Sequence, residues 1–72
     1  MELLEIKEAE HLRREEAAER LRALADALSR HNDVEFERGG VRFRLKVPDD
    51  IRLKVELEIE SDKTELEIEL TW

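Results

Sequence analysis

The chain has 72 residues, no cysteine and a formal net charge of −7, and charged residues make up 46% of it. This length predicts one domain, residues 1–72, near the lower limit at which a chain buries a core unaided. The lack of cysteine excludes disulfides and Cys-based zinc sites, and the acidic balance argues against nucleic-acid binding. A domain of this kind needs very regular packing or self-association for stability.

The first ten residues, MELLEIKEAE, have neither the basic start nor the apolar run of a signal peptide. No segment approaches the ~20 apolar residues that a membrane span requires. We therefore expect a cytoplasmic protein without a membrane partner. Within this stretch Leu4 and Ile6 alternate with Glu5 and Lys7, which predicts a short first strand.

A helix is predicted from Arg13 to about Arg30, because its apolar residues recur at the helical period. Asn32 follows as a residue suited to a left-handed helix end. The predicted apolar face of the helix consists of Ala17, Leu21, Leu24, Ala25 and Leu28.

After the helix, apolar residues alternate with polar ones through residues 34–72, which predicts four amphipathic strands. Gly39-Gly40 fits a two-residue hairpin turn rather than a phosphate-binding loop. With that turn Phe36 faces Phe43 and Glu35 faces Arg44, so apolar meets apolar and acid meets base.

Two further turns are predicted, at Pro48-Asp49-Asp50 and over residues 61–64. The first would bring Lys46 near Arg52 and Arg44 near Lys54. The second would set Leu57 opposite Ile68 and produce three successive acid-acid pairs: Glu60 with Glu65, Glu58 with Glu67, and Glu56 with Glu69. Like charges directly opposite one another destabilise a sheet.

Together these elements predict an α+β fold with the order β-α-β-β-β-β. It is a short strand, one helix and a four-strand antiparallel meander, with the helix packed on the apolar face of the sheet. A five-strand sheet is ~24 Å wide, whereas one helix covers ~10 Å. Either the sheet curls strongly around the helix or a second copy packs against the remaining apolar strip. A second copy is favoured, which predicts a homodimer formed through the apolar sheet face or an edge strand. The expected core or dimer contacts are Phe36, Phe43, Leu57, Ile59, Leu66, Ile68, Leu70 and Trp72.

The outer face of the predicted sheet carries an acidic band beside a basic band. Either band could bind a charged partner, a basic protein or a phosphate-bearing ligand, although a solvated face is the simpler interpretation of the glutamates. The acidic face comprises Glu56, Glu58, Glu60, Glu65, Glu67 and Glu69. The basic band comprises Arg42, Arg44, Lys46, Arg52 and Lys54.

No pattern of catalytic or metal-binding residues stands out. His11 and His31 have no ligand spacing between them, and they fit surface positions better than a metal site. The glutamates repeat along one exposed face, whereas acid-base chemistry needs two carboxyls in unlike environments within a cleft. We therefore expect a protein that is not an enzyme, with no catalytic, cofactor-binding or metal-binding residues.

Three segments resemble the amphi-Trp domain, a family of small archaeal and bacterial proteins: RREEAAERLRALADAL, VEFERGGVRFRLKVP and above all KVELEIESDKTELEIELTW. The resemblance covers nearly the whole chain and is most specific in the hairpin that ends at Trp72. At the helix start, Arg13-Arg14-Glu15-Glu16 lacks the hydroxyl cap usual in the family, and Asn32 stands near the usual glycine. The resemblance implies the architecture and transfers no catalytic residue.

The function expected from sequence is thus that of a small non-enzymatic interaction or structural module that self-associates. The alternative is a binding module that recruits a charged partner through its outer sheet face. Salt separates the two, since apolar association survives high ionic strength and charge recruitment weakens.

Overall fold

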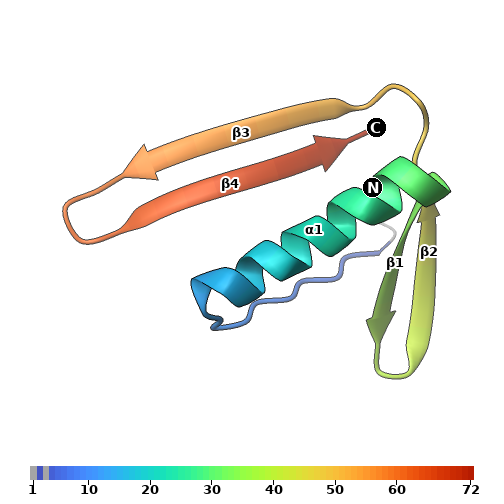
Figure 1. Cartoon of the computed structure of the whole chain (residues 1–72), viewed down its shortest axis with the longest axis horizontal. Coiled ribbons are helices and arrows are strands. Elements are labelled where there is room, and N and C mark those ends of the chain that lie inside the picture. Colours follow the sequence, from blue (N-terminus) through green and yellow to red (C-terminus); the bar gives the residue numbers. More distant parts are fainter. Residues whose placement is uncertain (1, 3) are drawn as a thin grey trace.

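The computed structural model describes residue 2 and residues 4–72 (Figure 1). The α+β class is confirmed, with one helix followed by four strands. The elements are α1 (Arg14–His31), β1 (Asp33–Arg38), β2 (Val41–Lys46), β3 (Arg52–Ile59) and β4 (Thr64–Thr71).

Helix α1 starts and ends close to the predicted positions. Arg13 precedes it in an extended conformation and gives no side-chain cap, although its carbonyl accepts a hydrogen bond from the Ala17 amide at 3.0 Å. Glu15 and Glu16 lie in the first turn, where the helix dipole favours negative charge. Asn32 ends the helix in the left-handed conformation (φ 56°, ψ 16°), as predicted.

The first hairpin has the predicted register. Phe36 lies opposite Phe43 and Glu35 opposite Arg44. Gly39 and Gly40 both have positive φ, 60° and 79°, which a type I′ turn requires. Local turn geometry and cross-strand chemistry thus favour the same pairing.

The predicted register of the second hairpin is wrong by two residues. Leu57 lies opposite Leu66, and Ile59 opposite Thr64. The reason is a tighter turn, in which the Glu60 amide donates to the Lys63 carbonyl at 2.8 Å and only two residues remain between them. A shift of two keeps every side chain on its predicted face, because side chains alternate with a period of two.

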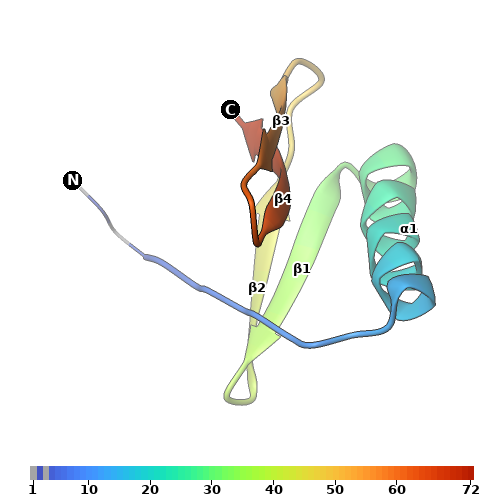
Figure 2. The ribbon, with the colours of Figure 1, turned by 90° about the vertical axis from the view of Figure 1, so that its left-hand side faces the viewer.

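The predicted four-strand meander is also wrong. The strands form two separate antiparallel hairpins, β1–β2 and β3–β4 (Figures 1 and 2). Pairing β2 with β3 would oppose Lys46 to Arg52 and Arg44 to Lys54, which is unfavourable. Pro48 follows β2 and has no amide hydrogen to donate to such a ladder.

The predicted first strand is absent, because residues 4–13 have no regular secondary structure. In Figure 2 this segment runs extended past the first hairpin. Side chains rather than a backbone ladder hold it: Arg38 Nη1 donates to the Lys7 carbonyl at 3.2 Å, and Arg20 donates two hydrogen bonds to the Glu10 carboxylate at 3.1 and 3.0 Å. The bond to Glu10 raises the pKa of Arg20.

The hydrophobic core of the single chain is very small. Among the side chains that the structure describes, only Val34 of β1 is buried, at 8% exposure. Leu24, Ala27 and Leu28 of α1 and Phe43 of β2 are half-buried. The helix therefore covers part of the first hairpin, and the second hairpin is packed against neither (Figure 1).

Candidate interaction surface

The second hairpin presents one continuous apolar face, defined here as the hairpin face. Seven of its eight large side chains are 51–72% exposed, and Leu70 is half-buried. The register places them in cross-strand pairs such as Leu57 with Leu66 and Val55 with Ile68, so they form a patch rather than scattered positions. Its residues are Leu53, Val55, Leu57, Ile59, Leu66, Ile68, Leu70 and Trp72.

A second apolar area lies on α1 and the first hairpin. Leu21 is 53% exposed and Phe36 is 38% exposed, and both Val41 and Leu45 are exposed as well. A hollow between α1 and β1 is lined in part by Leu24, Val34 and Phe36. The chain therefore has two separate apolar areas, and neither covers the other.

The total accessible surface of the chain is unusually large for a folded monomer of its mass. The accessible area is 7157 Å² for 8.6 kDa, whereas a folded monomer of that mass is expected to expose about 4,700 Å². The radius of gyration is 14.2 Å, against about 11 Å for a compact chain of this length. The excess of about 2,500 Å² per chain, or about 5,000 Å² for two copies, is at the upper end of what obligate dimers bury.

The outer faces of the two hairpins differ in charge balance. On the first hairpin Arg42 Nε lies 3.5 Å from Glu35 and 3.8 Å from Glu37, and Arg44 Nη2 lies 3.7 Å from Glu35. These arginines are thus partly neutralised by β1. The predicted basic band is divided between separate sheets, since Arg52 and Lys54 belong to β3.

On the second hairpin the acidic face stays only partly compensated. Glu56 lies opposite Glu67 and Glu58 opposite Glu65, while Lys54 lies opposite Glu69, a favourable pair that the sequence analysis missed. Lys54 Nζ is 3.6 Å from Glu56, and Lys63 Nζ is 3.5 Å from Glu65. Two acid-acid pairs therefore remain instead of the three predicted.

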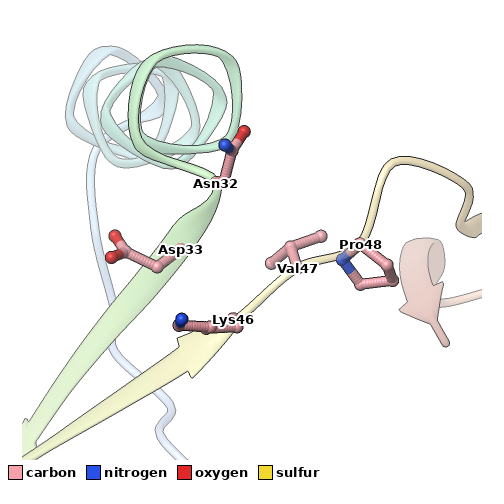
Figure 3. A pocket seen from close by; sticks show the side chains of 5 residues that line it. All are labelled: Asn32, Asp33, Lys46, Val47 and Pro48. Carbon is pink, nitrogen blue, oxygen red and sulfur yellow. The ribbon is translucent and has the colours of Figure 1, made fainter.

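A ligand or metal site is not evident in the part of the chain described. Residue 2 and residues 4–72 contain no group of three or more metal-ligand side chains. His11 is exposed, and the side chain of His31 lies outside the described part. A hollow at the end of the first hairpin is lined by Asn32, Asp33, Lys46, Val47 and Pro48 (Figure 3), none of them buried.

The one helix described, α1, is not apolar enough to cross a membrane. Its surface carries charged residues throughout, among them Arg22, whose Nη1 is 2.9 Å from Glu19.

The family relationship follows from the pattern of the whole chain: helix, glycine-turn hairpin, and an amphipathic final strand that leads to Trp72. A family model for the Amphi-Trp domain matches residues 1–72. The chain belongs to the Amphi-Trp family. No curated protein and no solved structure matches it. The Amphi-Trp assignment thus accounts for the architecture.

The predicted contact residues of the Amphi-Trp domain lie on the two hairpins, which the structure keeps separate. The predicted contacts Phe36 and Phe43 do meet across the first hairpin, and the other six all lie on the hairpin face. The separation of the hairpins was not predicted. Its signal was already present in the like-charge pairs that a β2–β3 ladder would create.

Proposed function

We propose that this Amphi-Trp domain is a non-enzymatic interaction module that self-associates through its apolar faces. The observation that carries the proposal is the hairpin face, with seven large apolar side chains that are at least half exposed. Water-exposed apolar patches of this size are uncommon on proteins that function as monomers. A second copy provides a complementary apolar surface without requiring another protein.

Covering apolar surface favours the association of two copies, and the loss of motion opposes it. Covering apolar surface on each copy contributes at most ~25 cal/mol per Å², because buried area does not convert fully into affinity. Association itself consumes an estimated 4–15 kcal/mol or more in lost motion. The balance supports a stable dimer, and two-fold symmetry is the commonest arrangement for one.

The alternative function is recruitment of a charged partner through the outer face. Glu58 and Glu67 make no ion pair within the described residues, so this part of the acidic face is available to a basic protein. A phosphate-bearing ligand is less well supported, because Arg42 and Arg44 already contact carboxylates of β1.

The two functions are distinguished by light scattering of the purified protein over a series of salt concentrations. Self-association through apolar faces predicts a mass of twice 8.6 kDa that persists at high salt. A mass of 8.6 kDa at all concentrations would reject self-association. A monomer that captures a basic partner only at low salt would favour the alternative.

A further inference from the structure

The outer edge of β3 has no partner strand in the described part of the chain. β3 pairs with β4 on one side only, and the second hairpin packs against neither α1 nor the first hairpin. In Figure 1, β4 lies on the α1 side of its hairpin and β3 on the other side. An unpaired edge presents amide and carbonyl groups that a strand of another chain can bind.

The hydrogen bonds inside the second hairpin determine which residues face this edge. The Glu60 amide donates to the Lys63 carbonyl at 2.8 Å, and pairs that exchange such bonds alternate along the strands with pairs that do not. The even-numbered residues of β3 therefore bond to β4, because the register continues unbroken from Glu60. The odd-numbered residues of β3 direct their amide and carbonyl groups to the free edge. These residues are Leu53, Val55, Leu57 and Ile59, all on the hairpin face and 60–72% exposed.

A two-fold contact between edges pairs a strand with its own copy, so the charges on its outer face have to complement themselves. The outer faces of β1, β2 and β4 each carry charges of one sign, and like charges directly opposite one another destabilise a sheet. Among the four strands β3 alone carries both signs on its outer face: Arg52, Lys54, Glu56 and Glu58.

We infer that β3 of one copy pairs antiparallel with β3 of a second copy, about a two-fold axis at Val55, to form a four-strand sheet. Val55 then lies opposite the same residue of the second copy, and Leu53 lies opposite Leu57. On the outer face every charged residue of β3 meets the opposite charge. The charged pairs, each formed twice, are Arg52 with Glu58 and Lys54 with Glu56. Apolar pairs and opposite charges placed across two strands both stabilise a sheet.

The neighbouring registers are less favourable. A slip of one residue is excluded, because it would set the free amide and carbonyl groups of one strand opposite residues whose groups already bond to β4. A shift of two residues sets either Lys54 or Glu56 opposite its own copy, depending on the direction. In the proposed register the like charges that approach each other are Asp50 and Glu60, which lie beyond the ends of β3.

The edge contact goes beyond the proposed self-association through apolar faces, because it uses a different surface of the hairpin. It places the hairpin faces of two copies on the same side of one sheet, and the face contact covers this joint area with a second such sheet. Two two-fold contacts combine in a four-chain assembly with D2 symmetry. The face contact alone gives a mass of twice 8.6 kDa, and both contacts together give four times 8.6 kDa. The β4 edges bound the sheet, since their glutamates repel those of another copy.

Cysteine crosslinking on the outer face tests the edge contact and its register, because the chain has no cysteine of its own and the face contact does not involve this side. Arg52 and Glu58 of different copies form a pair whose Cα atoms are about 4.5 Å apart, within the range of a disulfide. The double variant Arg52→Cys, Glu58→Cys should therefore form a covalent dimer on mild oxidation. Either single variant should not, because its two cysteines lie six residues apart along the sheet, about 20 Å. The matched control is Arg52→Cys, Glu67→Cys, whose second cysteine lies on the same outer face but on β4.

Charge reversals test the pairs themselves. Neither Arg52 nor Glu58 makes an ion pair within the described residues, so reversing them breaks no contact inside the chain. Arg52→Glu sets acids opposite acids in both pairs, and Glu58→Lys sets bases opposite bases. We expect each variant alone to associate edge to edge about tenfold more weakly at low ionic strength, because repulsion replaces attraction at both positions.

A mixture of the two reversed variants should regain the wild-type affinity, because both pairs in a mixed contact again join opposite charges. Sedimentation velocity of the mixture, with one variant fluorescently labelled, measures this. The matched control mixes Arg52→Glu with Glu67→Lys, which lies on the same outer face but on β4. That mixture should stay as weak as Arg52→Glu alone.

The outcomes separate the edge contact from the proposed function. Crosslinking of the first double variant alone, together with recovery in the first mixture, supports the β3 contact. An associated wild type whose double variant does not crosslink, or crosslinks no more than the single variants, overturns the β3 contact and leaves self-association through the faces intact. Reversals that leave association unchanged, or are not recovered by mixing, do the same. A monomeric wild type overturns both.

Discussion

Replacing Ile68 with alanine tests whether a second copy covers the hairpin face. Ile68 lies within β4, and its side chain is 51% exposed in the single chain. Full burial of an isoleucine is worth about 1.5–3 kcal/mol, so covering the exposed half is worth about 1 kcal/mol per copy. A two-fold dimer contains two copies of the residue. We expect a loss of about 2 kcal/mol of association free energy, or about a 30-fold rise in the dissociation constant.

Sedimentation equilibrium over a range of concentrations measures this constant directly. Glu58→Ala is the matched control, because Glu58 lies on the opposite face of the same hairpin and should leave the constant within about threefold of wild type. Circular dichroism checks that both variants keep their strands. If Ile68→Ala associates as tightly as wild type, the hairpin face is not the contact surface and the reasoning fails.

Three further predictions concern single residues. Trp72 is the only tryptophan, and it is 55% exposed in the single chain. Because association buries it, its fluorescence maximum should move to shorter wavelength as the protein concentration rises. A maximum independent of concentration would contradict burial on association. Gly40→Val should destabilise the first hairpin by about 1–2 kcal/mol, because φ is 79° there and a β-branched residue is strained at positive φ. Thermal unfolding at fixed protein concentration measures this, with Glu58→Ala as control. Asn32→Ala should lower the free energy of unfolding by about 1 kcal/mol, whereas Asn32→Gly should not, because the helix ends at Asn32 in a left-handed conformation. Thermal unfolding measures both variants. Equal melting temperatures would show that this conformation is not required.

The sequence predicts the first hairpin well because several independent signals agree. Gly39-Gly40 determines the turn type, and in that register Glu35 lies opposite Arg44, whereas a slip of one residue would set Phe36 opposite an arginine. The end of α1 is equally local, since it depends on Asn32. Such features follow from neighbouring residues, and no distant contact has to be known.

The second hairpin shows where local signals become ambiguous. A register shift of two keeps apolar opposite apolar and leaves Glu56 and Glu58 opposite glutamates, so the alternation alone cannot determine the register. The pair of Lys54 with Glu69 favours the observed register. The hydrogen bond between Glu60 and Lys63 determines it instead. Residues of special turn geometry, which would have signalled this turn, do not occur there.

The four-strand meander and the first strand were predicted wrongly because strand pairing depends on contacts between residues far apart in the sequence. Alternating apolar residues show that a segment suits a sheet, but they do not say which edge it joins. The segment of Leu4 and Ile6 joins none of the free strand edges, and side-chain contacts to Lys7 and Glu10 hold it instead. For β2 and β3 the charges of Lys46 and Arg52 oppose pairing.

The most direct test of the account is an isotope-filtered NOE spectrum of a sample that mixes labelled and unlabelled chains, because it records only contacts between copies. Self-association through the hairpin face predicts cross-peaks between the Ile68 methyl groups of one chain and apolar side chains of the other. A spectrum with no contacts between chains at millimolar concentration would contradict self-association itself.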